Sequence, residues 1–255
     1  MENIKYIIFD MDDTLLTSDK KVTTYTLSVL KMLQNLGLKI VINTARTKSF
    51  NQEYFDLIKP DYAILNGGSL IIDKNENILF EKTISKDVIN ALTDELLTYA
   101  STFSIYTEDE LFSSDSDYHS QGAIYFDFRN NKLNKESLKI VASFYDQEVA
   151  KNLASKYDLV YVPYLTGRFG RINRKDTSKE SGNRELMKLV GSSLKDTIVF
   201  GDDIGDLNMI NEAGIGILMK NAREEMKSKV KNISQYSNNE EGVAKFLVNY
   251  FNIKI

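Results

Sequence analysis

The chain has 255 residues, of which 36 are acidic and 32 are basic, and its formal net charge is −4. This length fits one large domain or two modest ones, and the charge balance gives no support for a general nucleic-acid or membrane-surface binder, which would need a basic patch. Cysteine is absent, which excludes disulfides, thiolate catalysis and zinc–thiolate sites.

Five short apolar segments are predicted to be strands: residues 5–10, 38–44, 61–66, 196–202 and 214–219. Each is rich in Ile and Val at successive positions, which is typical of parallel strands covered on both faces. Leucines at helical spacing and a terminal Gly37 predict a helix over residues 23–37, and a second short helix is predicted over 206–214. This alternation predicts an α/β fold with a doubly wound, Rossmann-like parallel sheet.

The middle of the chain follows a different pattern. Residues 85–101 and 134–145 are predicted to be helices, and the alternating residues 122–130 predict part of an antiparallel sheet with one exposed face. We therefore expect an α+β module over residues 82–170, inserted into an α/β core that comprises the remaining residues, 1–81 and 171–255.

Polar residues stand where three of the predicted strands end. "YIIFD" ends at Asp10, "IVINT" ends at Thr44 and "TIVFGD" ends at Asp202. Because sites in open α/β sheets form outside the carboxyl ends of the strands, we expect these residues to gather at one edge with Asp12 and Asp206. Clustered carboxylates repel each other, and an all-oxygen ligand set favours Mg²⁺. The hydroxyl of Thr44, backbone N–H groups after Asp10 and a lysine are candidate groups for holding a phosphate.

The nucleophile for phosphate chemistry follows by elimination. The chain has no cysteine, and its single histidine, His119, lies in a polar stretch where we expect a solvated loop. A carboxylate beside a metal can attack phosphorus and form an acyl-phosphate, while a second acid two residues away moves the proton. The alternative for Asp10 and Asp12 is an ordinary turn or helix N-terminus.

Four segments resemble, in order, the motifs of the haloacid dehalogenase-like superfamily of phosphotransferases: "DMDDTLL" (10–16), "NTAR" (43–46), "TSKESGNREL" (177–186) and "GDDIGDLNMI" (201–210). The inserted module falls between the second and third motifs. That layout, together with residues 64–71 and 214–222, resembles the Cof-like phosphatases, which carry a large α+β cap domain at this place. The resemblance covers the core, roughly residues 1–80 and 171–255.

The resemblance implies a role for each matching residue. It implies that Asp10 is the nucleophile and that Asp12 is the general acid/base, with its backbone carbonyl on the metal. The other implied groups are the phosphate-binding residues Thr44, Ala45 and Lys179 and the metal ligands Asp10, Asp12, Asp202 and Asp206. Lys175 is an alternative to Lys179 as the lysine of the third motif.

Several positions stay open at this stage. Arg46, Arg168 and Arg171 are candidate contacts for an anionic substrate, although a surface salt bridge is the alternative for Arg46. Asp13 stands where the superfamily most often has glycine, and Gly205 stands where it usually has asparagine. These departures raise two questions. The first is what role Asp13 has, and the second is whether a substrate contact is lost at Gly205.

We therefore predict a magnesium-dependent phosphatase that acts on small phosphorylated metabolites through an aspartyl-phosphate. A phosphomutase on the same core and a non-catalytic metal- or phosphate-binding module are the alternatives. No nucleic-acid or membrane partner is expected, and the oligomeric state is open. Since no signal-peptide pattern and no membrane-spanning apolar run is found, we expect a cytoplasmic protein.

Overall fold

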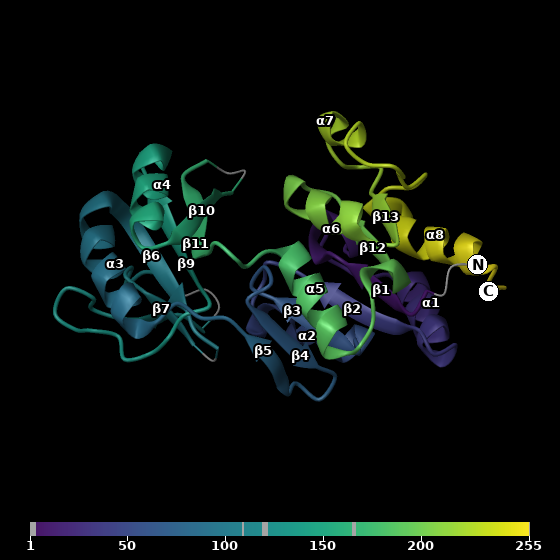
Figure 1. Cartoon of the computed structure of the whole chain (residues 1–255), viewed down its shortest axis with the longest axis horizontal. Helices are drawn as coiled ribbons and strands as arrows, with labels where there is room; N and C mark the ends of the chain where they lie inside the picture. The colour runs from purple at the N-terminus through teal and green to yellow at the C-terminus, as the bar shows by residue number, and fades with distance from the viewer. Residues whose placement is uncertain (1–3, 109, 119–121, 165–166, 255) are drawn as a thin grey trace. The chain divides into compact units, whose positions relative to one another are not determined.

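The computed structural model describes residues 4–108, 110–118, 122–164 and 167–254, so His119 lies outside the described residues. The chain forms two compact units (Figure 1). The first, the core unit, comprises Met1–Thr47, Asn51–Phe80 and Ser178–Ile255. The second, the cap unit, comprises Lys48–Phe50 and Glu81–Thr177.

The core unit is built on a seven-stranded sheet with the order β13-β12-β1-β2-β3-β4-β5. Its strands are β1 (Tyr6–Phe9), β2 (Lys39–Asn43), β3 (Tyr62–Leu65), β4 (Leu70–Asp73), β5 (Ile78–Glu81), β12 (Thr197–Gly201) and β13 (Ile215–Leu218). The five predicted apolar segments form five neighbouring strands that run parallel, and β4 is antiparallel to β3. The predicted α/β fold class with a parallel-sheet core is confirmed.

Helices cover both faces of this sheet. They are α1 (Thr24–Asn35), α2 (Gln52–Ile58), α5 (Lys179–Leu189), α6 (Leu207–Glu212), α7 (Glu224–Lys227) and α8 (Gly242–Phe251). Leu186 of α5 and Ile210 of α6 pack against Ile8 and Val199, while alternation turns Ile7 and Phe9 to the opposite face. Both faces are therefore apolar, as the continuous Ile and Val runs of the strands predict. Within the described residues, no helix is long and apolar enough to cross a membrane.

The cap unit contains a six-stranded sheet with the order β10-β11-β9-β6-β7-β8. Its elements are α3 (Lys86–Tyr99), β6 (Ala100–Tyr106), β7 (Leu111–Ser113), β8 (Ile124–Tyr125), β9 (Lys139–Phe144), α4 (Gln147–Lys156), β10 (Leu159–Pro163) and β11 (Phe169–Arg174). Neighbouring strands are antiparallel except for β7 and β8. Figure 1 shows α3 and α4 on the same side of the sheet, and their apolar residues share one core with it.

Two predicted elements of the cap unit differ from the structure. Residues 134–145, predicted to be a helix, contain the strand β9, in which Ile140, Ala142 and Phe144 face the buried core. These three residues recur with a period of two, rather than the helical period, and pack into one apolar core. Of the predicted strand 122–130, only Ile124–Tyr125 pairs, as β8. The predicted boundary between residues 170 and 171 falls inside β11, and the cap unit continues to Thr177.

Candidate active site

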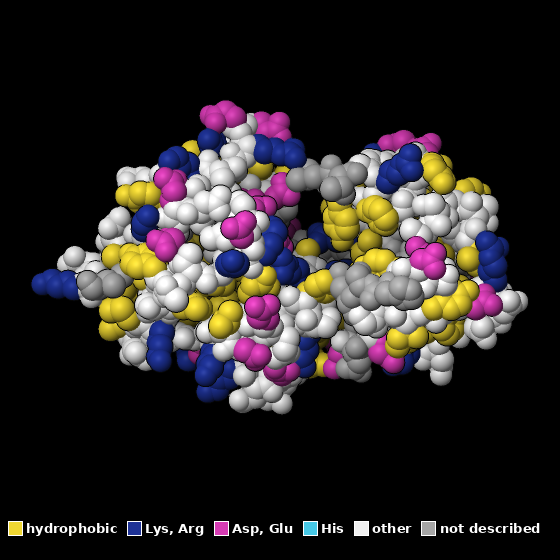
Figure 2. Space-filling view, turned by 180° about the vertical axis from the view of Figure 1, so that it is seen from behind, with side chains coloured by type: hydrophobic (Ala, Val, Ile, Leu, Met, Phe, Trp, Pro, Cys, Tyr) yellow, Lys and Arg dark blue, Asp and Glu magenta, His cyan; other side chains and the backbone are white. Residues whose placement is uncertain are grey.

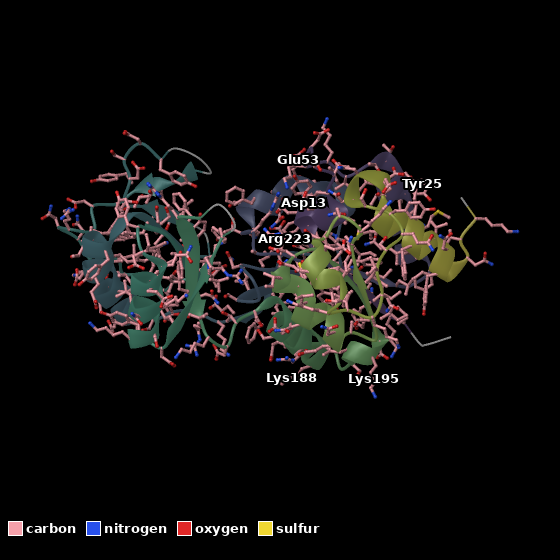
Figure 3. All side chains as sticks on the ribbon, turned by 90° about the horizontal axis from the view of Figure 1, so that it is seen from above. Asp13, Tyr25, Glu53, Lys188, Lys195 and Arg223 are labelled. Carbon is pink, nitrogen blue, oxygen red and sulfur yellow. The ribbon has the colours of Figure 1, made fainter. Side chains whose placement is uncertain are left out.

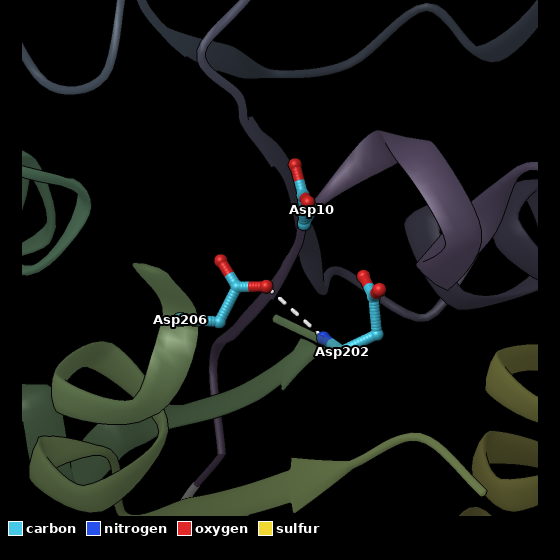
Figure 4. A group of neighbouring side chains, drawn as sticks. All are labelled: Asp10, Asp202 and Asp206. Carbon is cyan, nitrogen blue, oxygen red and sulfur yellow. Dashed lines mark hydrogen bonds between the residues drawn. The ribbon is translucent and has the colours of Figure 1, made fainter. Parts of the chain in front are cut away.

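Three carboxylates meet at the carboxyl ends of two neighbouring strands. Asp10 directly follows β1, Asp202 directly follows β12, and Asp206 closes the short 3₁₀ turn Ile204–Asp206. One carboxylate oxygen of each lies within 4.8 Å of the other two (Figure 4). Asp10 and Asp206 are buried, and Asp202 is half-buried. The structure thus brings together three of the four acids that the sequence proposes as metal ligands.

Lys179 supplies positive charge to this group. It is the first residue of α5, and its Nζ lies 2.9 Å from Oδ2 of Asp10 and 2.6 Å from Oδ1 of Asp206. Burial by itself lowers the pKa of Lys179, but the two carboxylates raise it above its ordinary value. The lysine is therefore a permanent cation beside two buried acids.

Asn43 and Asn183 hold the start of α5 in place. Asn43 is the last residue of β2, and its Nδ2 donates to the carbonyl of Lys179 and to Oδ1 of Asn183, both at 2.8 Å. All three residues are buried. The sequence reasoning missed Asn43, although it stands directly before Thr44 in the second motif.

Asp206 is fixed by close backbone contact. Its Oδ2 accepts hydrogen bonds from the N–H groups of Asp202 at 3.0 Å and Asp203 at 3.1 Å, the first of which is drawn in Figure 4. A Cβ atom placed on Gly201 would lie only 2.4 Å from Cβ of Asp206. Only glycine at position 201 leaves room for the Asp206 side chain.

Burial and mutual repulsion disfavour negative charge in the carboxylate group. Burial raises the pKa of Asp10 to about 7, an effect that Asp206 adds to and Lys179 opposes. Burial also raises the pKa of Asp202 to about 8, even though the Thr14 hydroxyl donates to its Oδ1 at 2.6 Å. The donors are all oxygen atoms, which fits a hard divalent cation such as Mg²⁺. Thr14, which the sequence reasoning left without a role, is the threonine of the first motif.

The side chain of Asp12 points to a different partner. Asp12 lies in the turn Met11–Leu15 with an extended backbone (φ −67°, ψ 131°), and Arg46 donates to its carboxylate from Nε at 2.7 Å and from Nη2 at 2.6 Å. Lys20 adds an ion pair at 2.9 Å. Burial alone would raise the pKa of Asp12, but Arg46 and Lys20 hold it below its usual range. The salt bridge considered for Arg46 is therefore present, and its partner is the second acid of the first motif.

Asp13 occupies a position with a left-handed backbone. Its φ is 54°, a conformation that favours glycine and that aspartate tolerates better than most residues. Its carbonyl accepts from Nδ2 of Asn221 at 2.7 Å, while its half-exposed carboxylate lies 3.8 Å from Nζ of Lys20. Asp13 is one of the residues labelled in Figure 3. The backbone conformation explains why glycine is common here and why Asp13 can replace it.

The remaining predicted residues of the core unit lie around this site. Thr44 is buried, and its hydroxyl accepts from the N–H of Arg46 at 3.2 Å. Ala45 between them is half-buried. Gly205 is exposed, and a Cβ there would meet no heavy atom within 4 Å. A larger side chain would therefore fit at position 205, so the glycine is not required by packing.

The other predicted basic residues belong to the cap unit. Lys175 forms an exposed ion pair with Asp158 at 2.8 Å, so Lys179 is the lysine that joins the carboxylates. Arg168 is exposed and lies over the ring of Tyr145, at 5.5 Å from its centroid. Arg171 lies within β11.

Comparison with known proteins places these features in a family. The sequence model of the haloacid dehalogenase-like hydrolases matches residues 7–247. The chain therefore belongs to the haloacid dehalogenase-like hydrolases. The resemblance seen in the four motifs is confirmed, and so is the prediction of an enzyme, a phosphatase of this family with a Cof-like layout.

Individual relatives match over nearly their whole length. MG265 of Mycoplasma genitalium, provisionally named a phosphatase, is 27% identical, with coverage of 96% of this chain and 97% of that protein. The 5-amino-6-(5-phospho-D-ribitylamino)uracil phosphatase YcsE of Bacillus subtilis is 24% identical, with coverage of 95% and 94%. Among solved structures, the subclass IIB sugar phosphatase BT4131 has a TM-score of 0.80 at 21% identity, with coverage of 98% and 100%, which is a likeness of fold.

Proposed function

We propose that this chain is a magnesium-dependent phosphatase that hydrolyses small phosphorylated metabolites through an aspartyl-phosphate on Asp10. The observation that carries the proposal is the pairing of the Asp10 carboxylate with the Lys179 ammonium inside a group of three carboxylates. A nucleophilic carboxylate needs nearby positive charge to approach a phosphate dianion, and this arrangement provides it.

The proposed metal site uses side chains of Asp10, Asp202 and Asp206 and the backbone carbonyl of Asp12. The mutual approach of the three carboxylates supports it, because a divalent cation would reduce the repulsion between them. The cation would also favour the ionised form of Asp10 and Asp202, which burial disfavours. When bound, Mg²⁺ would neutralise charge on the phosphoryl oxygens and orient the transferring group.

The chain's own residues then divide the reaction into two halves. In the first, an Oδ atom of Asp10 bonds to phosphorus while the bond to the leaving oxygen breaks, and Asp12 gives that oxygen a proton. This step requires Asp12 to leave its ion pairs with Arg46 and Lys20 and to take up a proton beforehand. In the second, Asp12 takes a proton from water, the water oxygen bonds to phosphorus, and the Asp10–phosphorus bond breaks to release inorganic phosphate. Lys179 and the Thr44–Ala45 segment would hold the phosphoryl oxygens throughout.

The names of two similar proteins support small molecules as substrates. YcsE is named for a phosphorylated ribitylaminouracil and BT4131 for sugar phosphates, so a sugar phosphate, nucleotide or cofactor phosphate is the proposed class. Figure 2 shows acidic and basic side chains interspersed over the surface in view. The expectation of no nucleic-acid partner stays a prediction from the charge balance of the sequence. A cytoplasmic location stays a prediction from the sequence.

A metabolite screen tests the proposal. About 100 phosphorylated metabolites are incubated with the protein and Mg²⁺, and the release of inorganic phosphate is measured. Asp10→Asn serves as the blank, and Asp56→Asn, which changes an exposed acid of α2, serves as the matched control. Release by the wild type and Asp56→Asn alone supports the proposal. A phosphomutase would instead convert one phosphosugar into another, and equal activity of Asp10→Asn would refute the nucleophile.

A further inference from the structure

The loop that joins β3 to β4 in the core unit has no role in the reaction above. Leu65 pairs with Leu70 at the base of this hairpin, so residues 66–69 make the loop, and all four of them are buried. We call them the buried loop. Connecting loops normally run over the surface, because their backbone polar groups need partners. A buried loop therefore has to find those partners inside the protein.

The backbone of the buried loop is left-handed at three successive residues. The φ angles are 52° at Asn66, 68° at Gly67 and 99° at Gly68. Such angles favour glycine, and asparagine tolerates them better than most residues do. The sequence Asn-Gly-Gly therefore permits a backbone that few other sequences would adopt.

One side of the buried loop holds the second motif. The N–H of Asn66 donates to the carbonyl of Arg46 at 3.0 Å. The N–H of Gly67 donates to the carbonyl of Thr44, also at 3.0 Å. The N–H of Thr44 in turn donates to the carbonyl of Ile64 in β3 at 2.9 Å. The proposed phosphate-binding segment that starts at Thr44 is thus fixed to β3 and its loop through backbone hydrogen bonds.

The other side of the buried loop touches the start of α5. A Cβ atom on Gly68 would lie only 2.1 Å from the carbonyl oxygen of Ser178. Ser178 is the N-cap of α5, its carbonyl accepts from the N–H of Gly182 at 3.0 Å, and the next residue in the chain is Lys179. A Cβ on Gly182 would lie 2.5 Å from Cγ2 of Ile64 and 3.1 Å from Cα of Gly68. Glycine on both sides therefore lets the loop and the helix approach this closely.

We propose that the buried loop is a positioning element for the reaction, which sets the distance between the Thr44–Ala45 segment and Lys179. Gly68 is its positioning residue, because its contact with Ser178 fixes where α5 begins and thereby where Lys179 stands. The phosphate-holding roles of that segment and of Lys179 rest on the proposed function. The loop meets both elements through backbone atoms, which have less freedom to rearrange than long side chains have.

The contact at Gly68 leaves no room for adjustment. Ordinary contact of a Cβ begins at 3.4 Å, so in Gly68→Ala either the Ser178 carbonyl or the loop has to move. Phosphoryl transfer depends almost entirely on positioning and electrostatic stabilisation. Displacement of a catalytic group by about 1 Å can cost on the order of 100-fold in rate, so a shift at the start of α5 matters if it reaches Lys179.

Two variants test the proposal, with a matched control. Gly68→Ala and Gly182→Ala disturb the contact from its two sides, and Gly182 lies inside a helix, where alanine is well tolerated. Gly37→Ala is the control, because Gly37 has a similar φ of 90° but no heavy atom within 4 Å of its Cβ position. It carries the same backbone strain as Gly68→Ala without the clash. Circular dichroism and thermal melts establish that each variant is folded.

The first measurement is binding of inorganic phosphate to the full chain with Mg²⁺, followed by ³¹P nuclear magnetic resonance. We expect the Kd to rise about tenfold or more in Gly68→Ala and Gly182→Ala, because charge-assisted hydrogen bonds to phosphate are lost. In Gly37→Ala it should stay within about twofold. The Kd of Mg²⁺ alone, from calorimetry, should change less than about threefold in every variant, since Asp10 and Asp202 follow β1 and β12 whereas the loop follows β3.

A double variant tests whether the loop acts through the lysine. In Lys179→Met the start of α5 no longer carries the ammonium group, so adding Gly68→Ala should weaken phosphate binding by less than about threefold more. With a substrate from the metabolite screen, Gly68→Ala and Gly182→Ala should lower kcat about tenfold or more, whereas Gly37→Ala should keep it within about twofold.

A loop that merely connects β3 and β4 would give a different result. The variants would then lose thermal stability but keep wild-type phosphate affinity, which would overturn the proposal. Equal losses of Mg²⁺ and phosphate affinity, full additivity with Lys179→Met, or a wild type that binds no phosphate would also overturn it. Failure of the wild type to hydrolyse any phosphomonoester refutes the proposed function alone, because the phosphate-binding comparison still decides the role of the loop.

Discussion

The ammonium of Lys179 lies 2.9 Å from the Asp10 carboxylate and is nearly as buried as its partner, each side chain being 10% exposed. Removing one member of a buried ion pair leaves the other charge without compensation. We therefore expect Lys179→Met to lower the free energy of unfolding by about 3 kcal/mol in EDTA. Urea denaturation followed by circular dichroism measures it.

The matched control for this prediction is Lys175→Met. Lys175 pairs with Asp158 in solvent, and such exposed pairs contribute little to stability. Its free energy of unfolding should stay within about 0.5 kcal/mol of the wild type. Equal effects of the two substitutions on the free energy of unfolding would show that the Lys179–Asp10 pair contributes no more to stability than the exposed Lys175–Asp158 pair.

The close approach of Gly201 and Asp206 predicts a steric effect on activity. Gly201→Ala would put a Cβ 2.4 Å from Cβ of Asp206, so this acid must move. Because displacement of a catalytic group by about 1 Å can cost on the order of 100-fold in rate, we expect a loss of that size in kcat/KM. Gly205→Ala, four residues later in open space, should keep activity within about twofold. Loss of activity in Gly205→Ala but not in Gly201→Ala would contradict the conclusion that position 201, and not position 205, requires glycine.

Magnesium should stabilise the folded chain through the three carboxylates. A ligand at 100 times its Kd adds about 2.7 kcal/mol to the free energy of unfolding, which raises Tm by several degrees. We expect Mg²⁺ to raise the Tm of the wild type and of Asp56→Asn but to have little effect on Asp202→Asn. A Mg²⁺-induced rise of the same size in Asp202→Asn would argue against its place in the metal site.

Lys139 should make stability depend on pH in the alkaline range. Its folded-state pKa is about 7, whereas an unfolded lysine has a pKa of about 10.4. Between these values the unfolded chain binds the proton and the folded chain does not, so stability rises with pH. Relative to Lys139→Met, the wild type should gain about 2 kcal/mol between about pH 7.5 and 9.5. Parallel pH profiles of the two proteins would show that Lys139 titrates normally.

The parallel core was predictable because its signal is local. Ile7, Ile8 and Phe9 form an uninterrupted apolar run that is typical of a strand covered on both faces, and the run ends at Asp10. The motif residues Asp10, Lys179 and Asp206 meet in the structure although they are far apart in the chain. The strand ends at one sheet edge predicted the meeting of the acids, whereas the place of Lys179, the first residue of α5, was implied only by the motif resemblance.

The features that were missed depend on tertiary context. In β9, Lys139 and Ser143 alternate with buried apolar residues, yet the segment also contains leucine and alanine, which favour helices. The pairing of Asp12 with Arg46 spans 34 residues and depends on how the turn after β1 lies beside the end of β2. No local pattern specifies such a contact.

The central claim is that Asp10 carries the phosphoryl group during turnover, and the acyl-phosphate itself can be trapped. The protein is mixed with Mg²⁺ and a substrate, quenched within one turnover and reduced with borohydride, which converts an aspartyl-phosphate into homoserine. Peptide mass spectrometry then locates the change. We predict homoserine at position 10 in the wild type and none in Asp10→Asn. Homoserine at another aspartate, or continued turnover by Asp10→Asn, would contradict the account.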